Sequence, residues 1–203
     1  MKILAAIMIM TGLAGAREIR PNNGQTVKQI VAACISFGGN ATSILQARII
    51  ASKIYAEIGV KIQWHNDPRD CVSPRDGIVI TFFRDTPADL HPGALASALP
   101  FERTHIVLFH DRVMTATTQQ MLPTLVAYVL VHEIGHILQG VVRHSEGGIM
   151  KARWERTDFD EMRRGSLRFN NLDLILIHDG LDKRSAAGSQ ASSSDDPKRS
   201  GAQ

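Results

Sequence analysis

A run of apolar residues that also holds two histidines and a glutamate constrains this chain more than any other feature. Residues 132–136 read His-Glu-Ile-Gly-His, and apolar pairs stand on both sides of them at 130–131 and 137–138. On a helix, residues four apart lie on one face, so His132 and His136 face the same way. Polar groups without partners are costly to bury. The segment therefore predicts a buried helix whose polar side chains share a site.

The spacing of these three residues favours a metal site. Two imidazoles four apart on a helix can hold one Zn²⁺, and Glu133 follows the first of them, where it can polarise a water on the metal. The same pentapeptide also occurs by chance as a polar turn of a surface helix, but its apolar flanks here argue against that alternative. We predict one zinc ion with His132 and His136 as ligands and Glu133 as general base.

A catalytic zinc ion has three protein ligands and one open position, so a third ligand is expected after the helix. His144 is the predicted ligand, because it lies eight residues after His136 and beyond Gly140, a residue that can take positive φ and end the helix. Two glutamates further along, Glu155 and Glu161, remain alternatives for this position.

These residues resemble the metzincin clan of zinc endopeptidases, and within it the matrixin-like pattern HExxHxxGxxH with a Met-turn after it. His144-Ser145 is similar to the His-Ser found in many members, and Ile149-Met150 is similar to the Met-turn. The chain departs from the strict pattern, with Gln139 in place of glycine and Val142 in place of histidine. Glycine therefore comes one residue late, and the third histidine two residues late.

The resemblance covers roughly residues 27–180 and implies a small zincin-like catalytic domain that cleaves peptide bonds. It implies that the methionine side chain of Met150 lies beneath the metal. It also implies that an edge strand, expected at 93–100, pairs with an extended peptide substrate.

The pattern of apolar residues predicts an α+β fold with a mixed, twisted sheet of about five strands, a backing helix, the helix with the histidines and a C-terminal helix. The helices are expected from 42 or 43 to 59, from between 117 and 124 to 139, and over 158–181. The strands are expected over 30–37, 60–64, 77–83, 93–100 and 105–109, the last running on into 110–112.

The two ends of the chain differ from its middle. Residues 1–16 have a basic start, an apolar stretch and an Ala-Gly-Ala site, which is the layout of a secretory signal peptide. The catalytic domain is then expected over 17–182. Residues 183–203 lack large apolar side chains and are predicted to form a disordered tail. We therefore expect a secreted or periplasmic protein without stable membrane insertion.

Charge and cysteine content limit the possible partners. A formal net charge of +3 without a basic run argues against nucleic-acid binding. Export favours a disulfide between Cys34 and Cys71, although two buried thiols are the alternative. The sequence predicts an exported, monomeric zinc metalloendopeptidase that acts on peptides or proteins. The alternative is a secreted binding or structural protein that keeps the zincin fold with little or no turnover.

Overall fold

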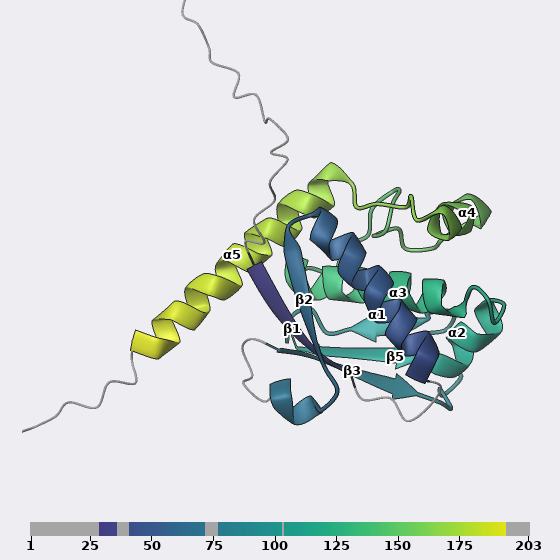
Figure 1. The fold of residues 1–203 in the computed structure, drawn as a ribbon, viewed down its shortest axis with the longest axis horizontal. Coiled ribbons are helices and arrows are strands. Elements are labelled where there is room, and N and C mark those ends of the chain that lie inside the picture. The colour runs from purple at the N-terminus through teal and green to yellow at the C-terminus, as the bar shows by residue number, and fades with distance from the viewer. Residues whose placement is uncertain (1–28, 36–40, 72–76, 103, 194–203) are drawn as a thin grey trace, which may run out of the picture.

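The computed structural model describes residues 29–35, 41–71, 77–102 and 104–193. The strands of these residues all end before residue 110, and only helices follow them (Figure 1). The strands are β1 (Gln29–Ile35), β2 (Val60–His65), β3 (Gly77–Phe83), β4 (Ala96–Ala98) and β5 (His105–Phe109). The helices are α1 (Ala41–Glu57), the 3₁₀ turn η1 (Pro68–Cys71), α2 (His110–Ala116), α3 (Leu122–Gln139), α4 (Arg156–Arg164) and α5 (Asn171–Ser193).

The strands form one mixed sheet in the order β2-β1-β3-β5-β4. The first four of these run parallel, and β4 is antiparallel to β5. The prediction of a mixed five-stranded sheet with an edge strand is therefore confirmed. That edge strand is shorter than the predicted 93–100, because Gly93 has a φ of +79° and turns the chain before β4 begins.

Helices α1 and α3 pack against each other and against one face of the sheet, where most of the apolar core lies. Side chains alternate along β1, so Val31, Ala33 and Ile35 are buried while Ile30 is 61% exposed. The buried hydroxyl of Tyr55 on α1 donates a hydrogen bond of 2.9 Å to a backbone carbonyl in the middle of α3. These contacts fix α3 against the sheet.

The C-terminal part of the chain contains two helices where the sequence predicted one over 158–181. Helix α4 ends at Gly165, which has a φ of +64°, and its N-terminus carries a capping box made by Glu155 and Asp158. Helix α5 begins only at Asn171. The apolar periodicity across the two segments concealed this break, whereas the glycine and the capping residues give its position.

Helix α5 continues past the predicted domain end at 182 and reaches Ser193, and its second half projects away from the sheet in Figure 1. The predicted disordered tail over 183–203 therefore begins with eleven helical residues. A helix that is already packed extends at little cost through good helix formers such as Lys183, Arg184 and the alanines that follow. The signal segment 1–16 and residues 194–203 lie outside the described residues.

One helix was missed: residues 110–112, predicted as the end of a strand, begin α2. Asp111 lies in the first turn of α2, where a carboxylate favours the helix N-terminus. None of the helices in the described ranges combines the length and the hydropathy needed to cross a membrane.

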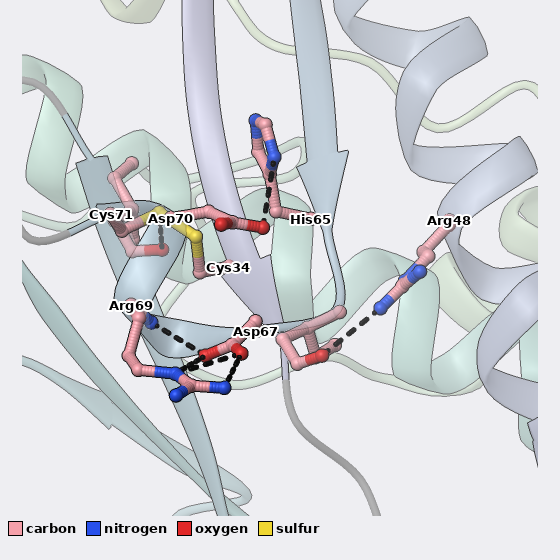
Figure 2. The surroundings of a disulfide bond; sticks show 9 residues. Cys34, Arg48, His65, Asp67, Arg69, Asp70 and Cys71 are labelled. Atoms are coloured by element: carbon pink, nitrogen blue, oxygen red, sulfur yellow. Dashed lines mark hydrogen bonds and ion pairs between the residues drawn. A yellow bond between two sulfur atoms is a disulfide. The ribbon is translucent and has the colours of Figure 1, made fainter.

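A disulfide joins Cys34 at the end of β1 to Cys71 in η1, as predicted, and both cysteines are buried (Figure 2). Side-chain pairs hold the same turn in Figure 2, where Arg69 binds Asp67 and Asp70 lies 3.6 Å from His65. An added Cβ on Gly77 would lie 2.6 Å from Cβ of Cys71, so β3 can start beside the bridge only with glycine there.

Candidate metal centre

Helix α3 places the two histidines and the glutamate of the sequence motif inside the protein. It starts with a proline in its first turn and ends at Gly140, whose φ is +66°. The exposed fractions of His132, Glu133 and His136 are 7%, 8% and 6%. Apolar packing around the helix thus holds three ionisable side chains in a largely water-free setting.

The imidazole rings of these histidines are oriented by backbone carbonyls. Nδ1 of His132 donates a hydrogen bond of 2.8 Å to the carbonyl of Ile149, and Nδ1 of His136 donates a longer one of 3.4 Å to the carbonyl of Val141. A carbonyl can only accept, so each Nδ1 carries the proton. Each Nε2 of a neutral ring is then left with a free lone pair.

These two Nε2 atoms lie 3.0 Å apart. With both protons on Nδ1, neither Nε2 can donate to the other, and the two lone pairs repel. A cation bound by both nitrogens removes that repulsion. The arrangement therefore fits a metal ion, and imidazole nitrogens are ligands that zinc prefers.

Burial keeps both rings in the form that binds a metal. It lowers the pKa of His132 to about 3 and the pKa of His136 to about 4, with the neighbouring imidazoles adding to the shift. A lowered pKa favours the neutral ring, so both imidazoles are unprotonated at neutral pH.

The structure brings His144 to the same place. The ligand atoms of His132, His136 and His144 all lie within 4.8 Å of one another. Ring centroids of His144 are 5.4 Å from His132 and 4.9 Å from His136. Three imidazoles that share one centre leave the fourth position of a tetrahedral zinc ion open.

The shifted spacing of the sequence pattern has a structural explanation. Helix α3 includes Gln139 as a buried residue and therefore ends one residue later than the strict pattern requires. Val142 is 66% exposed in the loop that follows, and His144 reaches the centre two residues further on.

Glu133 lines the cleft beside the histidines. Burial raises the pKa of its carboxyl group to about 8, and a hydrogen bond from the backbone N–H of Ala98 in β4 opposes this shift. A carboxylate with raised pKa is a stronger proton acceptor than an exposed one, as a general base requires.

Met150 is fully buried and lies against the helix at Gly135. An added Cβ on Gly135 would lie 2.7 Å from the sulfur of Met150, so only glycine leaves room for the methionine. The sequence pointed to Met150 but missed Gly135. Glycine is unfavourable inside a helix, so its presence in an apolar helix is a sequence signal of a close contact at that position.

The turn before Met150 is fixed by backbone hydrogen bonds. The N–H of Ser145 donates to the carbonyl of Met150 at 2.8 Å, and the N–H of Ile149 donates to the carbonyl of Arg168 at 2.9 Å. Gly148, with a φ of +77°, passes so close to Arg168 that a Cβ would collide with its carbonyl. This turn supplies the Ile149 carbonyl that orients His132.

A cleft of about 600 Å³ opens over the three histidines. Strand β4 and the residues before it form one wall, and residues 151–154 contribute to the other. The ring of Trp154 stands edge-on to His132 at 5.5 Å, and its Nε1 donates to the carbonyl of Ile149 at 3.3 Å. Strand β4 is the last strand of the sheet, and all of its residues line this cleft.

Arg112 holds the loop that leads to β4. Its guanidinium donates hydrogen bonds to four backbone carbonyls of that loop, those of Pro87, Leu90, His91 and Ala94. The neighbouring Asp111 accepts hydrogen bonds from the backbone and hydroxyl of Thr86. This loop places His91 at the cleft wall, outside the metal group.

Neither alternative third ligand joins the cluster. Glu155 caps α4 and lies 3.3 Å from the ammonium group of Lys151. Within the described ranges, the only group of three or more potential ligands that could hold one ion consists of His132, His136 and His144. Glu161 is not part of it.

No family model matches this chain, and no curated protein matches it in sequence. Among the solved structures that it resembles are the following two. One is archaemetzincin from Methanopyrus kandleri, 14% identical with a TM-score of 0.48, over 79% of this chain and 98% of that one. The other is a zinc-dependent peptidase from Methanocorpusculum labreanum, 13% identical with a TM-score of 0.48, over 73% of this chain and 99% of that one.

Proposed function

We propose that this protein is an exported zinc-dependent endopeptidase with a divergent, matrixin-like metal centre. The observation that carries the proposal is the pair of neutral imidazoles of His132 and His136, whose Nε2 atoms face each other at 3.0 Å. His144 supplies the third nitrogen, and Glu133 lies next to the first ligand on the same buried helix.

The bound ion supplies Lewis-acid chemistry, since zinc lowers the pKa of water and polarises a carbonyl. Glu133 takes the proton from the attacking water and passes it to the leaving amine. Burial raises the pKa of its carboxyl group to about 8, which strengthens the first of these transfers and leaves a conjugate acid that can still give up its proton near neutral pH. Hydrogen bonds from His132 and His136 to backbone carbonyls hold the ligand rings in place before substrate arrives.

The open edge of β4 supports cleavage within an extended chain. A peptide can add to an exposed edge strand through backbone hydrogen bonds, whatever its sequence. Strand β4 pairs with β5 on one side only, and its residues line the cleft. A peptide bound along it passes over the three histidines and Glu133.

Two features support export to an oxidising compartment. Residues 1–16 have the layout of a signal peptide, and the bridge between Cys34 and Cys71 is of a kind that persists outside the cytosol. We propose a secreted or periplasmic location on these grounds.

Replacing Glu133 by glutamine tests the activity. The Glu133→Gln variant should retain about one zinc per chain by metal analysis, because the glutamate is not a ligand. It should lose cleavage of a quenched fluorescent peptide library by at least about 100-fold, the lower range for a general base. A variant that cleaves as fast as the wild type would refute the assigned base. Zinc-loaded wild-type protein that binds peptides without cleaving them would favour a binding protein with a zincin fold.

A further inference from the structure

The third histidine differs from the other two in how it is held. His132 and His136 each donate a hydrogen bond to a backbone carbonyl. His144 makes no such bond to any residue in the described parts of the chain, and it is exposed to solvent. Its position must therefore come from the loop that carries it.

Both sequence neighbours of His144 bind the same carboxylate oxygen. Nη1 of Arg143 lies 2.9 Å from Oδ1 of Asp173, and the hydroxyl of Ser145 donates to that oxygen at 2.6 Å. Asp173 lies in the first turn of α5 and is fully buried. A charged acceptor makes both hydrogen bonds stronger than neutral ones.

Asp173 is itself fixed in position. The backbone N–H of Asn170 donates to Oδ2 of Asp173 at 3.2 Å, and the side-chain oxygen of Asn170 accepts from the backbone N–H of Asp173 at 2.9 Å. The same carboxylate thus caps α5 with one oxygen and holds the loop with the other. Helix α5 packs in turn on the end of α3, the helix that carries the other two ligands.

We propose that Asp173 is the positioning residue of the metal centre, holding His144 on the metal through Arg143 and Ser145. The proposal rests on the zinc centre of the proposed function. It adds to that function an account of how the exposed third ligand is held. The rings of His132 and His136 are held by hydrogen bonds to backbone carbonyls, whereas His144 is held by the loop that Asp173 fixes. Outer partners of metal ligands of this kind change metal affinity by roughly 10–100-fold when they are replaced.

Zinc affinity measured by chelator competition in a double-mutant cycle tests this role. Asp173→Asn alone should weaken zinc binding by roughly 10–100-fold. In a His144→Ala background the same substitution should change the affinity by less than about three-fold, because its effect passes through His144. An equal loss in both backgrounds would show a general structural role and overturn the proposal.

Ser145→Ala provides a second variant that keeps the charge pair and the α5 cap, for the case that Asp173→Asn does not fold. It should weaken zinc binding by roughly 10-fold, the lower end of the effect of a hydrogen bond to a charged group. Ser52→Ala is the control, since Ser52 also makes a side-chain hydrogen bond, which it accepts from Trp64, but lies on α1 away from the cleft. Equal zinc affinities for these two serine variants would overturn the proposal.

A cobalt-substituted sample adds a readout that does not depend on activity. The visible absorption spectrum of the Co²⁺-loaded Asp173→Asn variant should differ from that of the wild type and resemble that of His144→Ala. An unchanged spectrum would overturn the proposal. Wild-type protein that binds no zinc would refute the proposed function as well, whereas wild-type zinc binding with additive losses would refute only the role of Asp173.

Discussion

Removing the disulfide should cost this protein a large share of its stability. Cys34 and Cys71 are separated by 37 residues in the sequence. Closing a loop of that size lowers the entropy of the unfolded chain by about 13 cal/mol/K, which stabilises the folded state by about 4 kcal/mol at 25 °C. Domains of this kind are stable by only about 5–15 kcal/mol. The reduced protein should therefore remain folded at 25 °C with a small margin.

Urea unfolding of oxidised and reduced wild-type protein, with the metal removed from both, measures this difference. In a thermal scan of the same samples, the melting temperature should fall by roughly 8–16 °C on reduction, since 1 kcal/mol corresponds to roughly 2–4 °C in a chain of this length. The double variant Cys34→Ala/Cys71→Ala should lose at least as much, because both sulfur atoms are buried. Before the metal is removed, the double variant should contain about one zinc per chain, as the wild type should, since neither cysteine lines the cleft. Equal unfolding free energies for the oxidised and reduced forms would refute the loop-entropy reasoning.

Two further perturbations test the packing and the charge state of the site. Metal-free Glu133→Gln protein should lose stability as pH falls from about 6.5 towards 4. Burial lowers the pKa of His132 to about 3 and the pKa of His136 to about 4 in the folded protein. The unfolded chain therefore takes up these protons at a higher pH, and acid favours unfolding. The glutamine is needed because burial raises the pKa of the Glu133 carboxyl group to about 8, and this group would stabilise the folded protein as pH falls. A urea midpoint independent of pH in this window would contradict the prediction. Gly180→Ala should destabilise the protein by about 1–3 kcal/mol despite the better helix propensity of alanine, because a Cβ there would collide with a backbone carbonyl at the end of α3. Thermal unfolding measures this loss, and a higher melting temperature would show that α5 can move aside freely.

The elements with strong local signals were predicted from the sequence. Strand β3 matches the predicted 77–83, and α3 ends before Gly140 as expected, because an uninterrupted apolar run and a glycine that takes positive φ are local properties. The break at Gly165 and the helix α2 were missed. In both places the deciding contacts are caps and first-turn charges, which apolar periodicity does not reveal.

The candidate site divides in the same way. The sequence alone determined that His132 and His136 share a face and that Glu133 stands beside them, because helix geometry fixes the direction of residues one and four apart. It also marked His144 and Met150 as candidates. It left the choice between His144, Glu155 and Glu161 open.

Only the tertiary structure shows that His144 is the one of the three that lies with the other two histidines, because it reaches them through a loop whose path depends on distant residues. Asp173 and Gly180 on α5 and Gly135 on α3 act through contacts with segments far away in the sequence. The same holds for the carbonyls that orient the imidazoles and for the loop held by Arg112. The spacing within one helix is a local property that can be read from sequence, whereas the meeting of α3 and the His144 loop at one site, with α5 holding that loop, depends on the whole fold.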